Sequence, residues 1–401
     1  MKKIDYNFDE QKESVIRFID SVRTTNGAFP YALQRGSEGS LYGTCFVALL
    51  AELIDYTLPD HLQCLSSIEF CWNEDKGAFI DPSVDKDSFS NHDAHDETYL
   101  MWQSSYFAIN ALCALGAHNK YNFMPVTLLV EEETIPSWLD SLDWNKPWLV
   151  TNMVMFLGFF LHSNENTELT EYAKANYFDW LNEKQSPRDG FWGSAEDLLE
   201  RMAGGYHIIL FYFYYKQNLN YKPEILDATL SLVQSDYLFV KNGCGGSCED
   251  MDGIDIICRL YLDRDKTDKL IYKLLQKMAY RLVNAVNKDG GFSWRLKPKP
   301  WYILKCMLHG DWKGAFGSIR AFIHASLRRY HVNSVYYYSS NLNYPYQLNV
   351  SDSWSTLFRY QTIALLYYTE PSMFKHKCDW ILPKRPGLSM QIERNESHEK
   401  P

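Results

Sequence analysis

The chain lacks the marks of nucleic-acid-binding and membrane-spanning proteins. Its 401 residues carry a formal net charge of -10, and its two densest basic stretches, 295–305 and 375–385, are interrupted by Trp and Pro. A nucleic-acid surface usually shows as a basic patch or stripe, so we expect no nucleic-acid partner. No apolar run reaches the roughly 18–20 residues that cross a bilayer, which predicts no transmembrane segment.

Signals of export and several common motifs are also missing. The N-terminus has basic residues but not the apolar segment of a secretory signal. The nine cysteines, an odd number, include no Cys-x-x-Cys pair, which favours free thiols in a reducing cytoplasm. The sequence contains no Walker loop, no His-Glu-x-x-His, no Gly-x-Ser-x-Gly and no Gly-x-Gly-x-x-Gly after a strand. The site chemistry that these motifs carry is therefore not expected.

Aromatic side chains are abundant instead. They make up 15% of the residues, with 28 Tyr, 22 Phe and 12 Trp. A core can absorb many aromatic rings, but Tyr and Trp also need partners for their polar ends. A polar cavity lined by aromatic residues would supply these partners.

Glycine–aromatic turns recur along the chain at steps near fifty residues. They lie at 26–29, 76–79, 189–193 and 289–292, with a glycine cluster at 243–246 and a weaker unit around 138–148. Helical periodicity fills the segments between them, for example at 8–22, 42–56, 97–115, 195–216 and 354–368. Self-similarity of this length indicates stacked supersecondary units, here pairs of helices joined by a turn.

These units predict an all-α fold, a single (α/α)6 toroid of about six helical hairpins. We favour a closed ring because an open solenoid needs polar capping repeats, whereas 354–368 is as apolar as any interior unit. The toroid is expected to span residues 1–375. The Lys-, Glu- and Pro-containing residues 376–401 are expected to form a surface tail.

The second helix of each pair is predicted to line the ring, and polar residues gather near its N-terminal end. If these helices run parallel around the ring, those ends meet at one rim. The alternative is that each polar residue is a helix cap. The residues are Tyr42, Thr44, His92, His95, Asp96, Gln103, Thr151, Asn152, Arg201, Tyr206, His207, Glu249, Asp250, Asp252, Asp255, Asp352, Trp354 and Arg359.

Four carboxylates are concentrated at Glu249, Asp250, Asp252 and Asp255. On a helix, residues three apart are adjacent, and like charges that close raise one another's pKa. A carboxylic acid kept protonated beside an apolar cavity is a general acid for an alkene or a glycosidic oxygen. The alternative is an acidic helix start favoured by the macrodipole. That alternative explains the first two acids but not Asp255, which follows the first turn.

Two other groups have competing interpretations. His92 and His95 are three residues apart beside Asp93 and Asp96, a spacing that metal ligands can have, but a loop or cap role is commoner. We therefore predict no metal site. His207 is either a core histidine or a cavity residue. Asp352 and Arg359 either form a buried ion pair or take part in catalysis.

The turn after 181 resembles the QW motif of squalene and hopene cyclases. Leu181, Gln185, Gly190 and Trp192 stand at its spacing, and the turns at 27–29, 77–79 and 290–292 resemble weaker copies. The layout of residues 8–370 is similar to the α/α toroid of terpenoid cyclases and protein prenyltransferase β-subunits. The resemblance implies a deep aromatic cavity in which an Asp-x-Asp-Asp motif protonates an alkene and aromatic faces stabilise carbocations.

The acid motif departs from the family's pattern. Asp250 and Asp252 match its first two acids, but Gly253 stands where the third would be. The zinc pattern of the prenyltransferases, an Asp-x-Cys with a later His, is absent around Cys248 and Cys258. The resemblance therefore implies the fold more directly than the reaction.

Three functions remain open at this stage. One is acid-initiated chemistry on an isoprenoid or related substrate, without a cofactor, although Mg²⁺ enters if the substrate is a diphosphate. Another is a carbohydrate-active (α/α)6 enzyme, a glycoside hydrolase, lyase or epimerase that pairs Asp250 or Asp252 with Asp96 or Asp352 across a cleft. The third is a non-catalytic toroid that binds a glycan, lipid or peptide.

The predicted site follows from these hypotheses. Its catalytic residues are Asp252 or Asp250 as the general acid, with Glu249 and Asp255 tuning it. Its substrate-binding residues are His95, Asp96, Tyr42, Asn152, Tyr206, His207, Asp352, Trp354 and Arg359.

Overall fold

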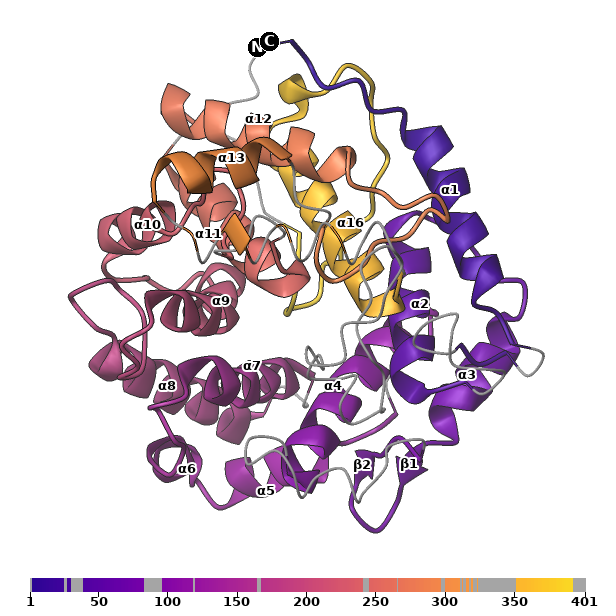
Figure 1. Cartoon of the computed structure of the whole chain (residues 1–401). Coiled ribbons are helices and arrows are strands. Elements are labelled where there is room, and N and C mark those ends of the chain that lie inside the picture. The colour runs from indigo at the N-terminus through magenta and orange to yellow at the C-terminus, as the bar shows by residue number, and fades with distance from the viewer. Residues whose placement is uncertain are drawn as a thin grey trace, which may run out of the picture.

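In the computed structural model, helices form an inner ring and an outer layer (Figure 1). It describes residues 2–24, 27–29, 39–82, 96–117, 120–163, 167–240, 245–264, 266–296, 300–310 and 351–391, with 312, 315, 316, 319 and 323. Within these residues, each inner helix contacts the next and the last contacts the first, so the ring is closed. The inner helices are α2 (Leu41–Leu53), α4 (Glu97–Ala114), α7 (Pro147–Ser163), α9 (Leu198–Tyr214), α11 (Ser247–Asp263) and α16 (Ser353–Thr369).

The outer layer is more irregular than the ring. Its helices are α1 (Phe8–Ser21), α3 (His61–Glu69), α5 (Met124–Glu131), α6 (Ile135–Asp140), α8 (Glu168–Lys184), α10 (Lys222–Ser231), α12 (Lys269–Val283) and α13 (Pro300–Leu308). A short antiparallel pair, β1 (Trp72–Asn73) and β2 (Ala78–Phe79), frames the second turn, and a single 3-10 turn, η3 (Pro371–Met373), follows α16. The predicted all-helical toroid is confirmed, whereas the count of six hairpins stays a prediction. Among the described helices, none is long and apolar enough to cross a membrane.

Burial patterns explain why the two layers differ. Helix α12 buries one stripe, Ile271, Leu275, Met278 and Leu282, which recur at the three- and four-residue steps of one helical face. Helix α16 is buried around nearly its whole circumference, polar residues included. An inner helix packs against the ring's centre on one side and the outer layer on the other. Polar side chains on inner helices are consequently removed from water.

The glycine–aromatic turns have the backbone conformation that the repeat predicts. Gly27, Gly77, Gly190, Gly245 and Gly290 all have positive φ, between +52° and +89°, a region that residues with a Cβ rarely adopt. Each of these glycines therefore closes a turn that another residue would strain.

The QW-like turn is fastened by its own side chains. Gln185 Nε2 donates to the carbonyl oxygens of Gly190 (2.9 Å) and Asn220 (3.0 Å), and Trp192 Nε1 donates to the Leu181 carbonyl (2.8 Å). These bonds tie the end of α8 to the turn that leads into α9 and to the segment before α10. The spacing that resembles the QW motif thus has a structural purpose here.

Contacts between neighbouring inner helices show that they run in the same direction. Tyr42, near the start of α2, donates to Gln103 Oε1 of α4 (3.0 Å). Arg359 of α16 pairs with Asp250 near the start of α11 (2.6 Å). The N-terminal halves of these helices therefore lie at the same end of the ring, as the sequence analysis predicts.

The predicted surface tail is wrong for its described residues, 376–391. Cys378, Trp380, Leu382 and Met390 are buried, and the Ile381 amide donates to the Leu53 carbonyl at the end of α2 (2.9 Å). Lys and Pro in this segment indicate exposure, but its apolar residues alternate with polar ones and pack onto the ring. Residues 392–401 lie outside the described part of the chain.

Comparing alanine substitutions at two glycines with similar φ distinguishes the cost of backbone strain from the cost of steric overlap. Gly290 has φ +89°, and an added Cβ would overlap the Ser14 carbonyl of α1. Gly116 has φ +72°, and among the described residues, its chain neighbours aside, no atom lies within 4 Å of an added Cβ. Replacing Gly116 by Ala should cost only about 1 kcal/mol of strain. Replacing Gly290 by Ala should lower the free energy of unfolding by about 3 kcal/mol or more, because α1 must also move. Chemical denaturation of the two variants measures both values, and equal losses would contradict this packing.

Candidate functional site

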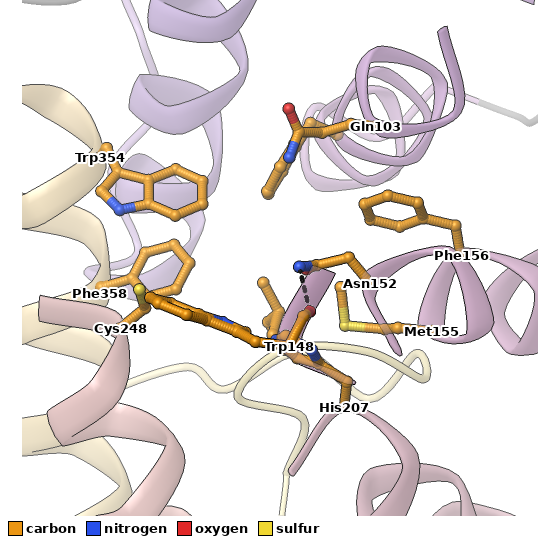
Figure 2. Close-up of a pocket in the computed structure, with 11 residues that line it drawn as sticks. Gln103, Trp148, Asn152, Met155, Phe156, His207, Cys248, Trp354 and Phe358 are labelled. Carbon is orange, nitrogen blue, oxygen red and sulfur yellow. Dashed lines mark hydrogen bonds between the residues drawn. The ribbon is translucent and has the colours of Figure 1, made fainter. Parts of the chain in front are cut away.

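A cavity of about 30 Å³ lies inside the ring, among residues of five inner helices and Leu388 of the C-terminal segment. Figure 2 shows Trp354, Phe358 and Cys248 on one side of it and Phe156, Asn152 and Met155 on the other. This volume has room for about two water molecules, so a larger ligand requires the lining side chains to move. The lining residues are Gln103, Phe107, Trp148, Asn152, Met155, Phe156, His207, Cys248, Trp354, Phe358 and Leu388.

Aromatic rings dominate one side of the cavity. Trp354 stacks on Phe358 of the next turn of α16, with centroids 4.1 Å apart and planes 24° apart. Phe107 of α4 meets the Trp354 ring edge-on at 5.6 Å, and Phe46 of α2 does so at 5.0 Å. Neighbouring rings hold one another in such offset and edge-to-face geometries. The cavity therefore has a rigid wall of π-faces.

The polar groups of the cavity are neutral. Asn152 Nδ2 donates to the Trp148 carbonyl (2.9 Å), as Figure 2 shows. His207 Nδ1 shares a hydrogen bond with Thr151 Oγ1 (3.1 Å), and burial lowers the pKa of this imidazole to about 3. His207 is consequently uncharged at ordinary pH. Gln103 links the cavity to Tyr42 and Tyr99 through its amide (3.0 and 3.2 Å).

Asp250 is held in a buried network beside the cavity. Its carboxylate accepts hydrogen bonds from the Phe239 and Gly246 amides (2.9 and 3.1 Å) and pairs with Arg359 at 2.6 Å. Both members of the pair are fully buried. Arg359 also donates to the Trp294 carbonyl (3.2 Å). The network joins α11 to α16 and gives Asp250 a structural role, and Arg359 therefore pairs with Asp250 rather than with Asp352.

Asp255 is likewise paired. Arg259, one turn later on α11, lies 2.9 Å from its carboxylate. Burial raises the pKa of Asp255, and Arg259 opposes that rise. Tyr206 of α9 faces the same acids, and burial raises the pKa of its hydroxyl well above the usual value.

Asp252 differs from both neighbours. Its side chain is fully buried, and within the described part of the chain neither carboxylate oxygen has a hydrogen-bond partner. Burial, followed by the charges of Glu249, Asp255 and Asp250, raises its pKa well above the usual value. The surroundings of Asp252 therefore favour the protonated, neutral form of this acid. It follows the cavity residue Cys248 by one helical turn on α11.

Glu249 and Asp352 have intermediate acidity. Loss of hydration raises the pKa of the half-buried Glu249 to about 7, and the Asp250 charge adds to this rise. Burial also raises the pKa of Asp352 to about 7. Asp352 caps α16, where its carboxylate accepts from the amide and hydroxyl of Ser355 (2.6 and 2.8 Å).

The predicted substrate-binding residues are only partly brought together. Asn152, His207 and Trp354 line the cavity, while Tyr42 contacts it through Gln103. Asp96 is exposed and caps α4 by accepting from the Tyr99 amide (2.8 Å), so the capping interpretation holds there. His95, with His92, lies outside the described residues. In the described part of the chain, no group of three His, Cys, Asp or Glu side chains has a metal-binding arrangement.

Several lining residues were missed from the sequence. Trp148, Met155 and Phe156 lie three or four residues before or after Asn152 on α7 and could have been found from that helical spacing. Leu388 had no such signal, because its place depends on contacts across the whole chain. None of these lining residues carries a carboxylate, so neither Asp252 nor the facing acid pair of the carbohydrate hypothesis is part of the lining.

Comparisons with known proteins identify the fold. No protein-family model and no curated protein matches the chain. A variant of the type II terpene cyclase MstE from Scytonema, solved with the substrate geranylgeranyl dihydroxybenzoate, is similar at a TM-score of 0.50 and 11% identity. The match covers 92% of this chain and 98% of that one. A second variant with this substrate gives 0.49 at 12% identity over the same shares of the two chains.

The apo form of that cyclase gives a TM-score of 0.44 at 12% identity, over 71% of this chain and 80% of the other. At such low identity the similarity speaks for the fold alone. The ring, the cavity and the substrate-bound comparison at 0.50 agree with the sequence-based resemblance. The chain has a terpenoid cyclase-like toroid fold.

Proposed function

We propose that this protein is a cyclase that protonates a carbon–carbon double bond of a linear isoprenoid in its central cavity. The observation that carries the proposal is Asp252, a buried carboxylic acid without a described hydrogen-bond partner on a helix that lines the cavity. Such an acid is kept neutral until a weakly basic substrate accepts its proton. The substrate class is supported by the similar fold of a cyclase solved with a geranylgeranyl compound.

The proposed reaction begins with the transfer of one proton from Asp252 to a terminal alkene. The π-electron pair of that alkene forms the new C–H bond and leaves a tertiary carbocation. A neighbouring double bond then supplies the electron pair for ring closure, and the charge moves to the next carbon. The final cation loses a proton to water, which restores a double bond, and Asp252 stays a carboxylate until it is reprotonated. No oxidant or reductant is consumed.

The aromatic wall suits cationic intermediates. The faces of Trp, Tyr and Phe attract a cation by roughly 0.5–2 kcal/mol each, and more when water is excluded. Trp354, Phe358 and Phe107 present such rings from α16 and α4. The neutral His207 and Asn152 add no competing nucleophilic carboxylate. In this proposal the cavity stabilises the charge without capturing it.

Glu249 is proposed to return the proton to Asp252. It lies one turn earlier on α11, is half-buried rather than fully buried, and has a pKa of about 7. A group with a pKa near the working pH can both lose and regain a proton. Protonation itself needs no metal ion, and Mg²⁺ would enter only by binding a diphosphate on the substrate.

Asp252 and Asp250 should respond oppositely to replacement by Asn. Asp252→Asn keeps the shape of a neutral group, so the melting temperature should change little while turnover of geranylgeranyl substrates falls at least about 100-fold. Asp250→Asn leaves Arg359 buried without its partner and should cost about 3–5 kcal/mol of stability. Mass spectrometry of products and thermal unfolding measure the two effects. Full turnover by Asp252→Asn, or its unfolding, would refute the acid's role.

The pH dependence of the unfolding free energy should reflect the raised pKa of Glu249. The folded pKa, about 7, lies above the ordinary value of 4.5, so the folded state binds this proton more tightly than the unfolded state. Its stabilising contribution is complete below pH 4.5 and is lost as the pH rises through 7, by at most about 1.4 kcal/mol per pH unit. Glu249→Gln should make the curve of unfolding free energy less steep between pH 5 and 7, and Asp352 accounts for slope that remains. Parallel curves for the two proteins would show that Glu249 has an ordinary pKa.

A further inference from the structure

A loop near the C-terminus, residues 383–391, enters the ring from the end opposite the helix N-termini. The Gln391 amide donates to the Pro383 carbonyl and closes the loop (2.7 Å). Arg385 forms a two-pronged ion pair with Glu52 in the last turn of α2 (2.7 and 2.6 Å) and donates to Asn110 near the end of α4 (2.7 Å). Paired, in-plane hydrogen bonds of this kind fix the position of both partners. The loop is thus anchored at the C-terminal ends of two inner helices.

Beyond Arg385 the loop is bound by inner-helix side chains at every step. The Leu388 amide donates to the Tyr106 hydroxyl (3.0 Å) and the Ser389 amide to the Tyr206 hydroxyl (3.4 Å). Arg259 donates to the Met390 carbonyl (3.1 Å), and the Ser389 hydroxyl contacts the Met251 sulfur (3.1 Å). These partners come from α4, α9 and α11. The loop therefore spans the interior of the ring.

The side chain of Leu388 is the loop's contribution to the cavity. Leu388 is half-buried, whereas Ser389 and Met390 beside it are buried against the helices. The other lining residues lie mainly in the N-terminal halves of the inner helices, and Leu388 arrives from the opposite end. Its isobutyl group is therefore the part of the loop that a ligand in the cavity would meet.

We infer that the loop 383–391 is the floor of the cavity and that Leu388 sets the length of the apolar ligand it accepts. The inference deepens the proposed function, because it concerns how long an isoprenoid chain the same cavity holds. A ligand that reaches the floor gains affinity with each buried methylene, by about fourfold, until it meets Leu388. Removing the isobutyl group should move that limit.

The experiment measures binding of straight-chain alcohols of increasing length, from decanol to octadecanol, by displacement of Nile red from the full-length protein. In Leu388→Ala the length at which affinity stops rising should increase by about two carbons, and the dissociation constant of that longer alcohol should fall on the order of tenfold. Leu388→Phe should shift the limit to shorter alcohols. Thermal unfolding of each variant establishes that it is folded.

Leu382→Ala is the matched control. It removes the same group from a buried leucine of the same segment that does not line the cavity, so it should lower stability and leave the length limit unchanged. The same limit in Leu388→Ala and Leu382→Ala, or no binding of any alcohol, would overturn the inference. A shifted limit in a protein that cyclises no isoprenoid would uphold the floor and count only against the proposed reaction.

Discussion

Burial of helix α11 on every side is the constraint on which the candidate site depends. A closed ring leaves α11 packed against α9, α16, α10 and α12, so Asp250, Asp252 and Asp255 cannot reach bulk water. An ionised carboxylate in such surroundings is costly unless a cation or several N–H groups compensate it. Each acid must therefore find a partner or remain protonated. The chemistry proposed for the cavity is a consequence of that choice.

The three buried acids of α11, Asp250, Asp252 and Asp255, differ in whether an arginine pairs with them. Asp250 receives Arg359 and two backbone amides, and Asp255 receives Arg259 from its own helix. Asp252, between them, receives neither arginine. Burial raises the pKa of Asp252. The negative charges of Glu249, Asp255 and Asp250 raise it further. A carboxyl group without a described partner beside two that are paired is an arrangement in which carboxyl groups of the same helix can have different roles.

Local patterns in the sequence were sufficient to predict the ring of helices. They were not sufficient to predict which charged residues pair with one another. The turn glycines could be identified because a left-handed turn requires glycine, and the inner helices because they are apolar all round. Asp96 and Asp352 were ambiguous, since the same residue type caps helices and performs catalysis, and both are caps here. The pairing of Asp250 with Arg359 joins positions 109 residues apart, and no local spacing encodes it. The position of Leu388 in the cavity could not be predicted for the same reason. It depends on a loop that follows the last inner helix and returns to the middle of the ring.

The central claim is that Asp252 remains a neutral acid when its neighbours are ionised. Infrared spectroscopy at pH 9 tests it directly, since Glu249 and Asp352, with pKa values of about 7, are then ionised. The account predicts a carbonyl stretch of a protonated carboxylic acid in the unmodified protein that disappears in Asp252→Asn. A spectrum with carboxylate bands alone, identical in the two proteins, would contradict it.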